Sequence, residues 1–383
     1  MAVKPKPTTI ANQPSWVVAS DRVELAVTAL GGHMAPVTFR LAGGRKAQPY
    51  FISPWQSEGR KITEPVLVPL RGDFFCMPFG GGSYRGRSYL VHGEPASKKW
   101  RLAGMDRRAR TVTLTLSIRT RAPAGKITKY LSLVDGQTVV YCRHELEGFT
   151  GRFPLGHHAT LAMPDRPGSI GITTSNIRLG LTFPVEPGRP AEGEYYAAAV
   201  AGRFDSLLRV PSIWKTPTHL DFTRRPGPAG FCDIVGVFHK TGRTPAWTTA
   251  VFEPEGYLWF SLKDPAVLPT LTIWSENRGR HTEPWDGRTN CLGLEDGCAY
   301  LAAGMGPSLG SNPASRAGAP TAIRLSPKSP TAIRYIQGVA KIPRSFGKTR
   351  TVKFTPGKVT FISTTGKKAS AMVCHKFLNT GEI

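Results

Sequence analysis

The sequence predicts an all-β fold, a large antiparallel β-sandwich of two sheets, and three observations lead to it. Short segments with alternating apolar and polar residues recur along the chain, with turns about every eight to fifteen residues. The 41 Gly and 33 Pro among 383 residues follow no period and exceed what long helices tolerate. No convincing helical periodicity runs for more than about three turns. Many short strands joined by turns are typical of such a sandwich.

The strand-like segments form two series along the chain. The first comprises residues 16–18, 23–27, 37–41, 111–118, 127–134, 139–145, 155–163 and 170–172. The second comprises residues 232–238, 248–252, 258–262, 270–274, 299–303, 321–325, 331–339, 351–354, 358–363 and 371–373. Residues 193–202 (GEYYAAAVAG) are the best candidate for a helix, a short one. The pentapeptide PTAIR, at 320 and again at 330, indicates two similar neighbouring strands, because two copies do not make a repeat architecture.

We expect one domain over residues 16–375. The Pro- and Gly-rich stretches 186–193 and 304–320 do not separate regions of different composition, so we interpret them as long loops. Residues 1–15 are expected to form a flexible N-terminus. This terminus has basic residues and prolines but no apolar segment, which predicts neither a signal peptide nor a membrane anchor.

The net charge of +24 raises the question of a polyanionic partner. The basic residues are scattered one or two at a time, without a basic helix, an RNA-binding aromatic pattern or zinc-finger spacing. A basic, solvated surface therefore explains the charge better than specific nucleic-acid binding. The six cysteines are widely spaced and form no CxxC pair, which indicates reduced thiols and a cytoplasmic protein.

Two strand-like segments carry groups suited to proton transfer near neutral pH. His157 and His158 lie in PLGHHATLA (154–162), and Glu295 lies in LGLED (292–296). Imidazole and carboxyl groups are the usual acids and bases because their pKa values can be tuned towards the working pH. Adjacent strand residues point to opposite faces, so at most one of the two histidines can face a given pocket. This disfavours a metal held by both, although one of them could still join His92 and a carboxylate at a metal.

Further polar and aromatic residues are candidates for substrate binding. Arg71 and Asp73, two residues apart on an extended segment, would share one face and suit hydroxyl recognition, with a surface ion pair as the alternative. His92 lies in a turn, where binding residues concentrate. In the polar loop 274–288, Glu276 and Trp285 suit a carbohydrate, because aromatic faces stack on sugar C–H groups while carboxylates bind hydroxyls. Trp274, at the start of this loop, is expected to pack between the sheets.

The order of these features resembles the aldose 1-epimerase (galactose mutarotase-like) superfamily. The resemblance is distributed over about residues 20 to 305. Two departures mark a divergent branch: Leu161 stands where the family usually has Tyr or Phe, and Asp296-Gly297 replaces a different sequence after the Glu. The matching pieces, in chain order, are the turn LGGH (30–33), Pro54-Trp55, Arg71 before a Phe/Gly segment, His92-Gly93, the strand His158-Ala159-Thr160-Leu161 and the strand Gly293-Leu294-Glu295.

The resemblance implies a sugar in an open cleft on one sheet. Glu295 would take a proton from the anomeric hydroxyl while His158 donates one to the ring oxygen, and Arg71 and His92 would hold the substrate. The other candidates for substrate contact are Asp73, His157, Trp285 and Glu276. No metal or organic cofactor is expected. The expected partner is a small-molecule carbohydrate, with no specific nucleic acid and no membrane, and the protein is expected to be a monomer or homodimer.

Two other functions fit the same pattern. The chain could be a sugar-binding or sensory protein without turnover. It could instead be a lyase or hydrolase acting on a polysaccharide, because related sandwiches host several chemistries. The second alternative predicts an extended groove and a Tyr or second carboxylate near His158.

Overall fold

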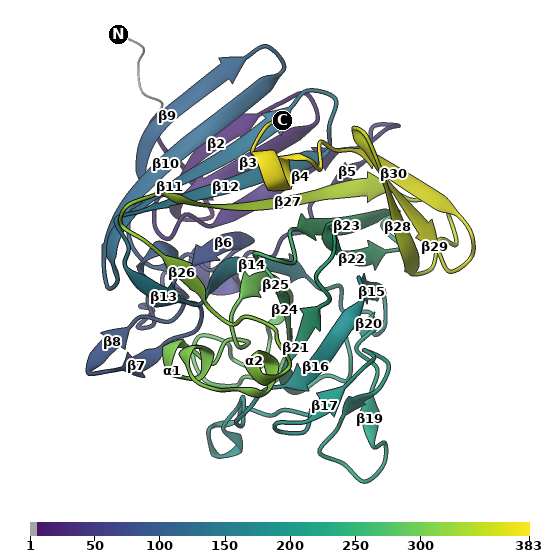
Figure 1. Cartoon of the computed structure of the whole chain (residues 1–383). Helices are drawn as coiled ribbons and strands as arrows, with labels where there is room; N and C mark the ends of the chain where they lie inside the picture. The colour runs from purple at the N-terminus through teal and green to yellow at the C-terminus, as the bar shows by residue number, and fades with distance from the viewer. Residues whose placement is uncertain (1–5) are drawn as a thin grey trace.

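The computed structural model describes residues 6–383, and two large antiparallel sheets dominate it (Figure 1). The strands of the 12-stranded sheet are β1 (Thr8–Ile10), β2 (Gln13–Ala19), β3 (Val23–Thr28), β4 (Met34–Arg40), β5 (Lys46–Ala47), β6 (Asp73–Cys76), β14 (Leu155–Ala162), β16 (Ile177–Thr182), β17 (Arg203–Phe204), β21 (Phe231–His239), β24 (Thr270–Asn277) and β25 (Asn290–Cys298). The strands of the 9-stranded sheet are β9 (Arg101–Arg108), β10 (Thr111–Arg121), β11 (Ala124–Val134), β12 (Val139–Glu147), β15 (Ile170–Thr174), β20 (Arg224–Arg225), β22 (Ala246–Phe252), β23 (Tyr257–Lys263) and β27 (Thr331–Lys341).

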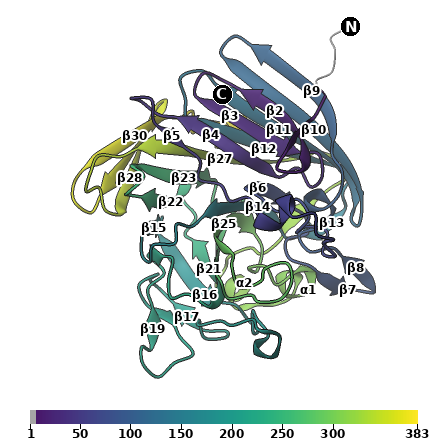
Figure 2. The same cartoon turned by 180° about the vertical axis from the view of Figure 1, so that it is seen from behind.

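The order of strands places β14 and β25, which are far apart in the sequence, side by side at the centre of the larger sheet. This order is β1-β2-β3-β4-β6-β14-β25-β24-β21-β16-β17, with β5 beside β4. Figures 1 and 2 show the sheet running from the purple strands β2 to β4 at one end of the molecule to the teal strands β16 and β17 at the other. The smaller sheet has the order β20-β15-β22-β23-β27-β12-β11-β10-β9. The predicted all-β sandwich is confirmed.

Smaller elements surround the sandwich. A three-stranded sheet has its own apolar cluster against β23 and β27, and the remaining elements are two-stranded ribbons and short helices. These elements are β7 (Gly82–Tyr84) with β8 (Arg87–Tyr89), β13 (Gly151–Phe153) with β26 (Ile323–Leu325), β18 (Val210–Pro211) with β19 (His219–Leu220), the sheet β28 (Thr349–Thr355), β29 (Lys358–Ser363) and β30 (Lys368–Met372), the helices α1 (Met305–Leu309), α2 (Pro313–Arg316) and α3 (Phe377–Thr380), and the 3-10 turns Pro54–Ser57, Glu94–Ala96 and Pro190–Glu192.

The facing sheets bury a continuous apolar core. Phe39, Leu114, Trp259 and Leu294 are fully buried members of it. Burying each such side chain contributes roughly 1.5–3 kcal/mol, which makes this core the main source of stability. Among residues 6–383, no helix is long and apolar enough to cross a membrane. The six cysteines are free thiols, as expected.

Three local predictions differ from the structure. Residues 193–202 form no helix, because Asp233 Oδ1 accepts hydrogen bonds from the backbone N–H groups of Ala197 (2.7 Å) and Ala198 (2.8 Å). Residues 299–303 form a turn rather than a strand, closed by a 3.2 Å bond from Ala303 N to Tyr300 O. The sheet begins at β1, so residues 8–15 of the expected flexible terminus are paired strands and their turn. Residues 1–5 lie outside the described part of the chain.

Candidate functional site

Pairing across neighbouring strands brings one row of side chains together on the larger sheet. Phe74 of β6 pairs with His158 of β14, and Glu295 of β25 pairs with Thr272 of β24. The β14–β25 register runs from Gly156 opposite Gly297 to Ala159 opposite Leu294, which sets His158 opposite Glu295. Because side chains alternate between faces, this whole row points away from the smaller sheet.

His158 and Glu295, predicted as the acid and base, are in direct contact. His158 Nε2 lies 3.1 Å from Glu295 Oε1, and both side chains are almost fully buried. Burial raises the pKa of Glu295 well above its usual range, and the charge of Arg280 offsets part of this rise. Burial, together with the neighbouring His92 and His33, lowers the pKa of His158 well below its usual range. Both shifts favour the uncharged pair, in which one proton is shared between the two groups.

The imidazole of His158 is held on its face and at its second nitrogen. Phe74 stacks on it with ring centroids 4.4 Å apart and an angle of 16°. His33 stacks on the other face of Phe74, with centroids 4.0 Å apart. His158 Nδ1 lies 3.1 Å from Thr160 Oγ1, which can accept its N–H in both the neutral and the charged ring. Nε2 therefore stays aimed at Glu295 in either protonation state.

His92 stands beside this pair as a hydrogen-bond donor. Its ring centroid is 4.9 Å from that of His158, and its backbone has a positive φ of 60°. The Gly80 N–H donates to His92 Nδ1 at 3.4 Å, so the neutral ring carries its proton on Nε2. Burial and the nearby Arg280 lower the pKa of His92 to about 4, which keeps the ring neutral at pH 7.

Arg280 is a cavity residue that the sequence analysis missed. Its guanidinium carbon lies 5.4 Å from the ring centroid of Trp274 and 5.0 Å from that of Trp285. Glu276 holds this loop, because its Oε1 accepts hydrogen bonds from Gly279 N (2.8 Å) and Arg280 N (3.2 Å), and its Oε2 lies 3.7 Å from Arg280 Nε. Glu276, predicted to bind substrate, is fully buried and instead positions Arg280. The only sequence signal was the polar density of the loop 274–288.

These groups line a cavity of about 450 Å³. Four predicted residues reach it: His92, His158, Trp285 and Glu295. Trp274, expected between the sheets, lines the cavity on the outer face instead. The remaining walls are Glu64, Val66, Leu67, Leu70, Phe74, Gly80, Gly81, Gly82, Val91, Phe183, Pro187, Glu194, Ile234, Arg280 and Ala302.

Arg71 does not reach the cavity, and we withdraw it as a substrate contact. Its side chain is fully buried, and its guanidinium donates to Ile10 O (3.0 Å) and Ala11 O (2.9 Å) and bonds Gln56 Oε1. Arg71 therefore fastens the β1–β2 turn to the body of the protein. This anchorage explains why the sheet begins before residue 16.

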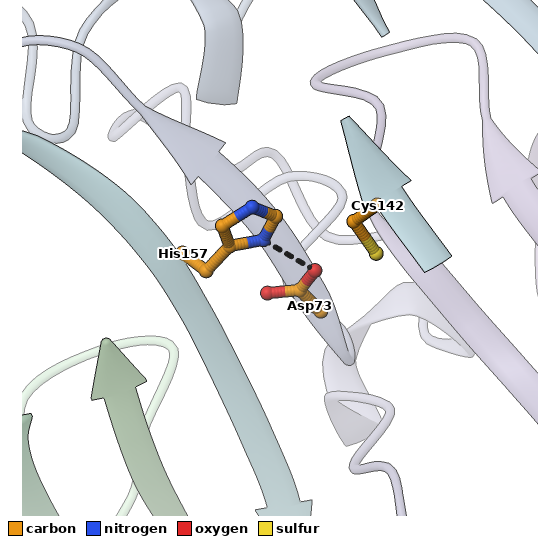
Figure 3. Close-up of side chains that lie close together, drawn as sticks. All are labelled: Asp73, Cys142 and His157. Atoms are coloured by element: carbon orange, nitrogen blue, oxygen red, sulfur yellow. Dashed lines mark hydrogen bonds and ion pairs between the residues drawn. The ribbon is translucent and has the colours of Figure 1, made fainter. Parts of the chain in front are cut away.

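Asp73 and His157 also lie away from the cavity, between the two sheets (Figure 3). Asp73 Oδ2 accepts hydrogen bonds from His157 Nδ1 and from Gln337 Nε2 of the facing sheet, both at 2.9 Å. Together with Cys142 they offer three potential metal ligands within 4.8 Å. Because Asp73 Oδ2 already binds two donors, the cluster suits a hydrogen-bonded tie between the sheets better than a metal cage. We therefore withdraw Asp73 and His157 as substrate contacts.

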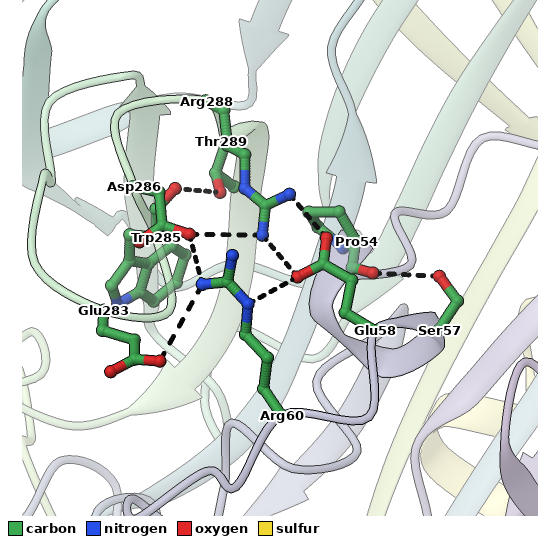
Figure 4. A network of polar contacts seen from close by, with 9 residues as sticks. All are labelled: Pro54, Ser57, Glu58, Arg60, Glu283, Trp285, Asp286, Arg288 and Thr289. Atoms are coloured by element: carbon green, nitrogen blue, oxygen red, sulfur yellow. Dashed lines mark hydrogen bonds and ion pairs between the residues drawn. The ribbon is translucent and has the colours of Figure 1, made fainter.

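A network of charged side chains ties together two loops beside the cavity (Figure 4). Arg60 binds Glu58 (2.9 Å) and Asp286 (2.5 Å), and Arg288 binds Glu58 (2.5 Å) from the opposite loop. Trp285 lies in the second of these loops and contributes its ring to the cavity wall. The network holds this part of the cavity wall in place. Its ion pairs are partly exposed, so each contributes little to stability alone and the network acts as a whole.

We expect Gly293→Ala to reduce any activity of the site sharply. A Cβ at position 293 would lie 3.1 Å from the Cβ of Trp274 and closer still to the Glu295 carboxyl, so the carboxyl would have to move. For the base that the sequence predicts at Glu295, a displacement of this kind costs about 100-fold in rate. Gly104→Ala is a matched control, because a Cβ there meets the end of the Asp106 side chain at 3.3 Å and the Cβ of Thr115 at an ordinary 4.0 Å. Equal turnover by both variants in a steady-state assay would contradict this role for Gly293.

This chain is similar to known proteins in structure but not detectably in sequence. No protein-family model matches the sequence, and no curated protein is similar to it in sequence. The chain is similar in structure to a galactose mutarotase-like protein from Clostridium acetobutylicum, with a TM-score of 0.59 and 9% identity over 88% of this chain and 98% of the other. It is also similar to an Escherichia coli protein provisionally described as an aldose 1-epimerase, with a TM-score of 0.56 and 12% identity over 86% and 99%. A galactose mutarotase related enzyme from Lactobacillus acidophilus gives a TM-score of 0.51 and 10% identity over 85% and 97%. The chain thus has the galactose mutarotase-like fold.

Proposed function

We propose that this protein interconverts the anomers of a small aldose, the reaction of aldose 1-epimerases. The observation that supports it most is the 3.1 Å contact between His158 Nε2 and Glu295 Oε1 inside the cavity. In an aldopyranose the anomeric hydroxyl oxygen and the ring oxygen are bonded to the same carbon. A reaction that takes a proton from one and gives a proton to the other therefore needs an acid and a base side by side.

In the proposed ring-opening step, Glu295 accepts the proton of the anomeric hydroxyl. The C1–O1 double bond forms, the C1–ring oxygen bond breaks, and His158 Nε2 delivers its proton to the ring oxygen. The step leaves Glu295 protonated and His158 neutral. After rotation about the C1–C2 bond, this is the state that closure on the other face requires, since both proton transfers then run backwards.

The unliganded pair needs one proton shift before the ring opens. Its pKa shifts favour a protonated Glu295 beside a neutral His158, whereas ring opening uses the ionised pair. The 3.1 Å contact provides the path for this shift, and the positive charge of Arg280 favours the ionised carboxylate. Arg280 and His92 Nε2 would donate to substrate oxygens and stabilise their developing charge. These roles require no metal and no organic cofactor.

The cavity favours a small sugar over a polymer. Its volume of about 450 Å³ lies in the lower half of the roughly 300–1,000 Å³ range of small-molecule sites. Among residues 6–383, no Tyr lines it, but Glu64 and Glu194 do, so the second carboxylate that the polysaccharide lyase alternative also allowed is present and the volume alone supports the small sugar. We propose a free monosaccharide as the partner, and a cytoplasmic location in keeping with the free thiols.

The test is NMR of the wild-type protein with a panel of monosaccharides and sugar phosphates. Saturation transfer reports binding, and magnetisation exchange between the two anomeric protons reports turnover. We expect at least one sugar whose anomer exchange is faster with protein than in buffer alone. Binding without faster exchange would identify a sugar-binding protein and overturn the proposal, as would no binding of any sugar.

The pKa shifts predict an unusual pH dependence for this exchange. Because the pKa of Glu295 is raised and that of His158 is lowered, the pair keeps its single shared proton from acidic pH through neutrality. We expect kcat/KM to be constant across this range and to fall on the alkaline side, when the pair loses that proton. Rates from pH 5 to 9, corrected for the uncatalysed reaction, measure this. A loss of activity centred near pH 6.5 on acidification would contradict it, because His158 would then titrate like an exposed imidazole.

A further inference from the structure

A second cavity, of about 530 Å³, lies on the other face of the larger sheet. On β21 and β24 it is lined by Asp233, Ser275 and Asn277, which alternate with the Ile234 and Trp274 of the first cavity. Its lining residues come from β19, β20, β21, β24, β25 and adjoining loops, and β19 and β20 lie at the lower right of Figure 1. Its apolar walls include Pro217, Leu220, Pro226, Pro228 and Phe231. The proposed epimerase reaction uses none of these residues.

Arg225 is the unusual residue of this second cavity. It is 4% exposed, and its guanidinium carbon lies 3.5 Å from the ring centroid of Phe222. Among residues 6–383, only its Nη1 has acceptors, the backbone oxygens of Asp221 and Arg224, both at 2.9 Å. Nε is buried without a partner, and no carboxylate oxygen within residues 6–383 lies within 4.0 Å of this guanidinium. Burial lowers the pKa of Arg225 to about 10, which leaves it charged at neutral pH.

Other charged groups nearby do not satisfy Arg225. Asp233 and Asp221 act on it only at longer range. The Oδ1 atom of Asp233 already accepts two backbone N–H groups, and that of Asp221 accepts the N–H and the hydroxyl of Thr223. Arg278, on the same cavity wall, is paired with Asp165 at 2.7 Å. Buried cations are almost always paired, so an uncompensated one facing a cavity requires an explanation.

Arg71 shows how the protein satisfies a buried arginine when no ligand is needed. Its Nη1 and Nη2 both have acceptors, from two backbone oxygens of the β1–β2 turn and from Gln56, whereas its Nε, like that of Arg225, is buried without a partner. It faces protein on every side, whereas Arg225 lines open space. The difference lies in Nη2, which has acceptors in Arg71 but none among residues 6–383 in Arg225, and in the open space that Arg225 lines.

We propose that the second cavity binds a small organic anion through Arg225. A carboxylate or phosphate group of the ligand accepts the unused guanidinium hydrogen bonds, and its apolar part lies against the proline and Phe231 walls. Guanidinium matches these oxyanions because its planar N–H groups can bind two oxygens at once. The exposed Arg224 on the same strand adds attraction at the rim. The high positive charge of the chain raises the local concentration of anions in the same way.

Hydrogen–deuterium exchange of the wild-type protein tests this proposal without a mutation. The probes are inorganic phosphate and D-glucuronate, with D-glucose as the neutral control, all at one ionic strength. We expect phosphate or glucuronate, but not glucose, to slow exchange in residues 217–233. Protection by phosphate alone or by glucuronate alone would support the proposal and identify the anionic group that the site prefers. No protection by either anion, or equal protection by glucose, would overturn the proposal.

Two variants then assign the effect to Arg225. Arg225→Met is expected to weaken binding of the protecting anion about tenfold or more, because charge-assisted hydrogen bonds are lost. Arg101→Met, which removes an exposed charge from β9 outside this cavity, should change affinity by about twofold or less. Equal losses in the two variants would mean nonspecific attraction and would contradict the proposal. If Arg225→Met does not fold, Arg225→Lys replaces it, because Lys keeps the charge but lacks the planar guanidinium group. Wild-type affinity for the anion in Arg225→Lys would contradict the proposal. Failure of the epimerase proposal would appear separately, as a lack of anomer exchange.

Discussion

Glu295→Gln is expected to abolish most of the catalysed anomer exchange and to leave the fold intact. Gln has the same shape, and its amide can still donate a hydrogen bond to His158 Nε2 across the 3.1 Å contact. It cannot accept a proton from the anomeric hydroxyl. Because a positioned acid or base contributes about 10²–10⁴-fold, kcat/KM should fall by that factor. Magnetisation exchange between the anomers, with the best sugar from the panel, measures this fall.

The same variant should be at least as stable as the wild type. In the unfolded chain Glu295 ionises above its usual pKa of 4.5, whereas burial raises its pKa in the folded protein. A carboxyl whose pKa is higher in the folded protein lowers the free energy of unfolding as the pH rises from its pKa in the unfolded chain to its pKa in the folded protein. Gln does not titrate, so the stability advantage of the variant should grow from about pH 4.5 upwards. Thermal unfolding midpoints at several pH values measure this growth.

A matched control separates chemistry from general damage. Glu24→Gln removes a half-exposed carboxylate from β3 of the same sheet, and should change neither exchange nor stability by much. Unchanged exchange in Glu295→Gln would leave the proposed base without a role. A large loss of stability in Glu295→Gln would contradict the assignment of its pKa shift to burial.

The sequence was sufficient to predict the fold and the central pair of the site. Period-two alternation marks strands directly, because successive side chains face core and solvent in turn. The resemblance in the order of short motifs then selected His158 and Glu295. Strand pairing brings these two residues opposite each other, although they lie 137 positions apart in the sequence. Motif order predicted this contact, and residue spacing alone could not have done so.

The arginine of the site could not be predicted in the same way. Arg71 lies next to β6, but Gly72 has a positive φ of 49°, which interrupts the alternation and turns the Arg71 side chain into the protein. Arg280 follows β24 in an irregular loop, where no periodicity states which way a side chain points. Its direction depends on the buried carboxyl of Glu276 and on two indole rings. These are tertiary contacts, which a single sequence does not reveal.

Strand parity could have excluded two of the wrong candidates. Asp73 precedes Phe74 and His157 precedes His158, so if the second of each pair faces the cavity, the first faces the core. The structure places Asp73 and His157 together on that inner face. Applying alternation to both strands at once would have moved them from the sugar site to the contact between the sheets.

Asp296→Asn is expected to cause the largest loss of stability among these variants. Asp296 alternates with Glu295 on β25 and faces the core, where its carboxylate pairs with Lys263 Nζ of the facing sheet. Ser261 Oγ donates to its second oxygen at 2.6 Å, and the two charged side chains are at most 1% exposed. Removing one partner of such a pair leaves the other charge buried and unpaired in a medium of low polarity, which costs about 3–5 kcal/mol of stability. Thermal and guanidinium unfolding measure the loss.

The pH dependence of stability and a double variant test whether the unpaired ammonium of Lys263 causes this loss. Burial already lowers the pKa of Lys263, and the charge of Asp296 counteracts this, so Lys263 loses its proton more easily in Asp296→Asn. A cation whose pKa is lower in the folded protein than in the unfolded chain destabilises the fold at low pH. This destabilisation decreases as the pH rises above the pKa in the folded protein, so the stability loss of Asp296→Asn should become smaller at alkaline pH. Removing both charges in Asp296→Asn/Lys263→Met should restore much of the stability, because a buried pair replaced as a unit is close to neutral. A double variant as unstable as the sum of the single variants would show instead that packing around β25, and not the unpaired charge, determines the loss.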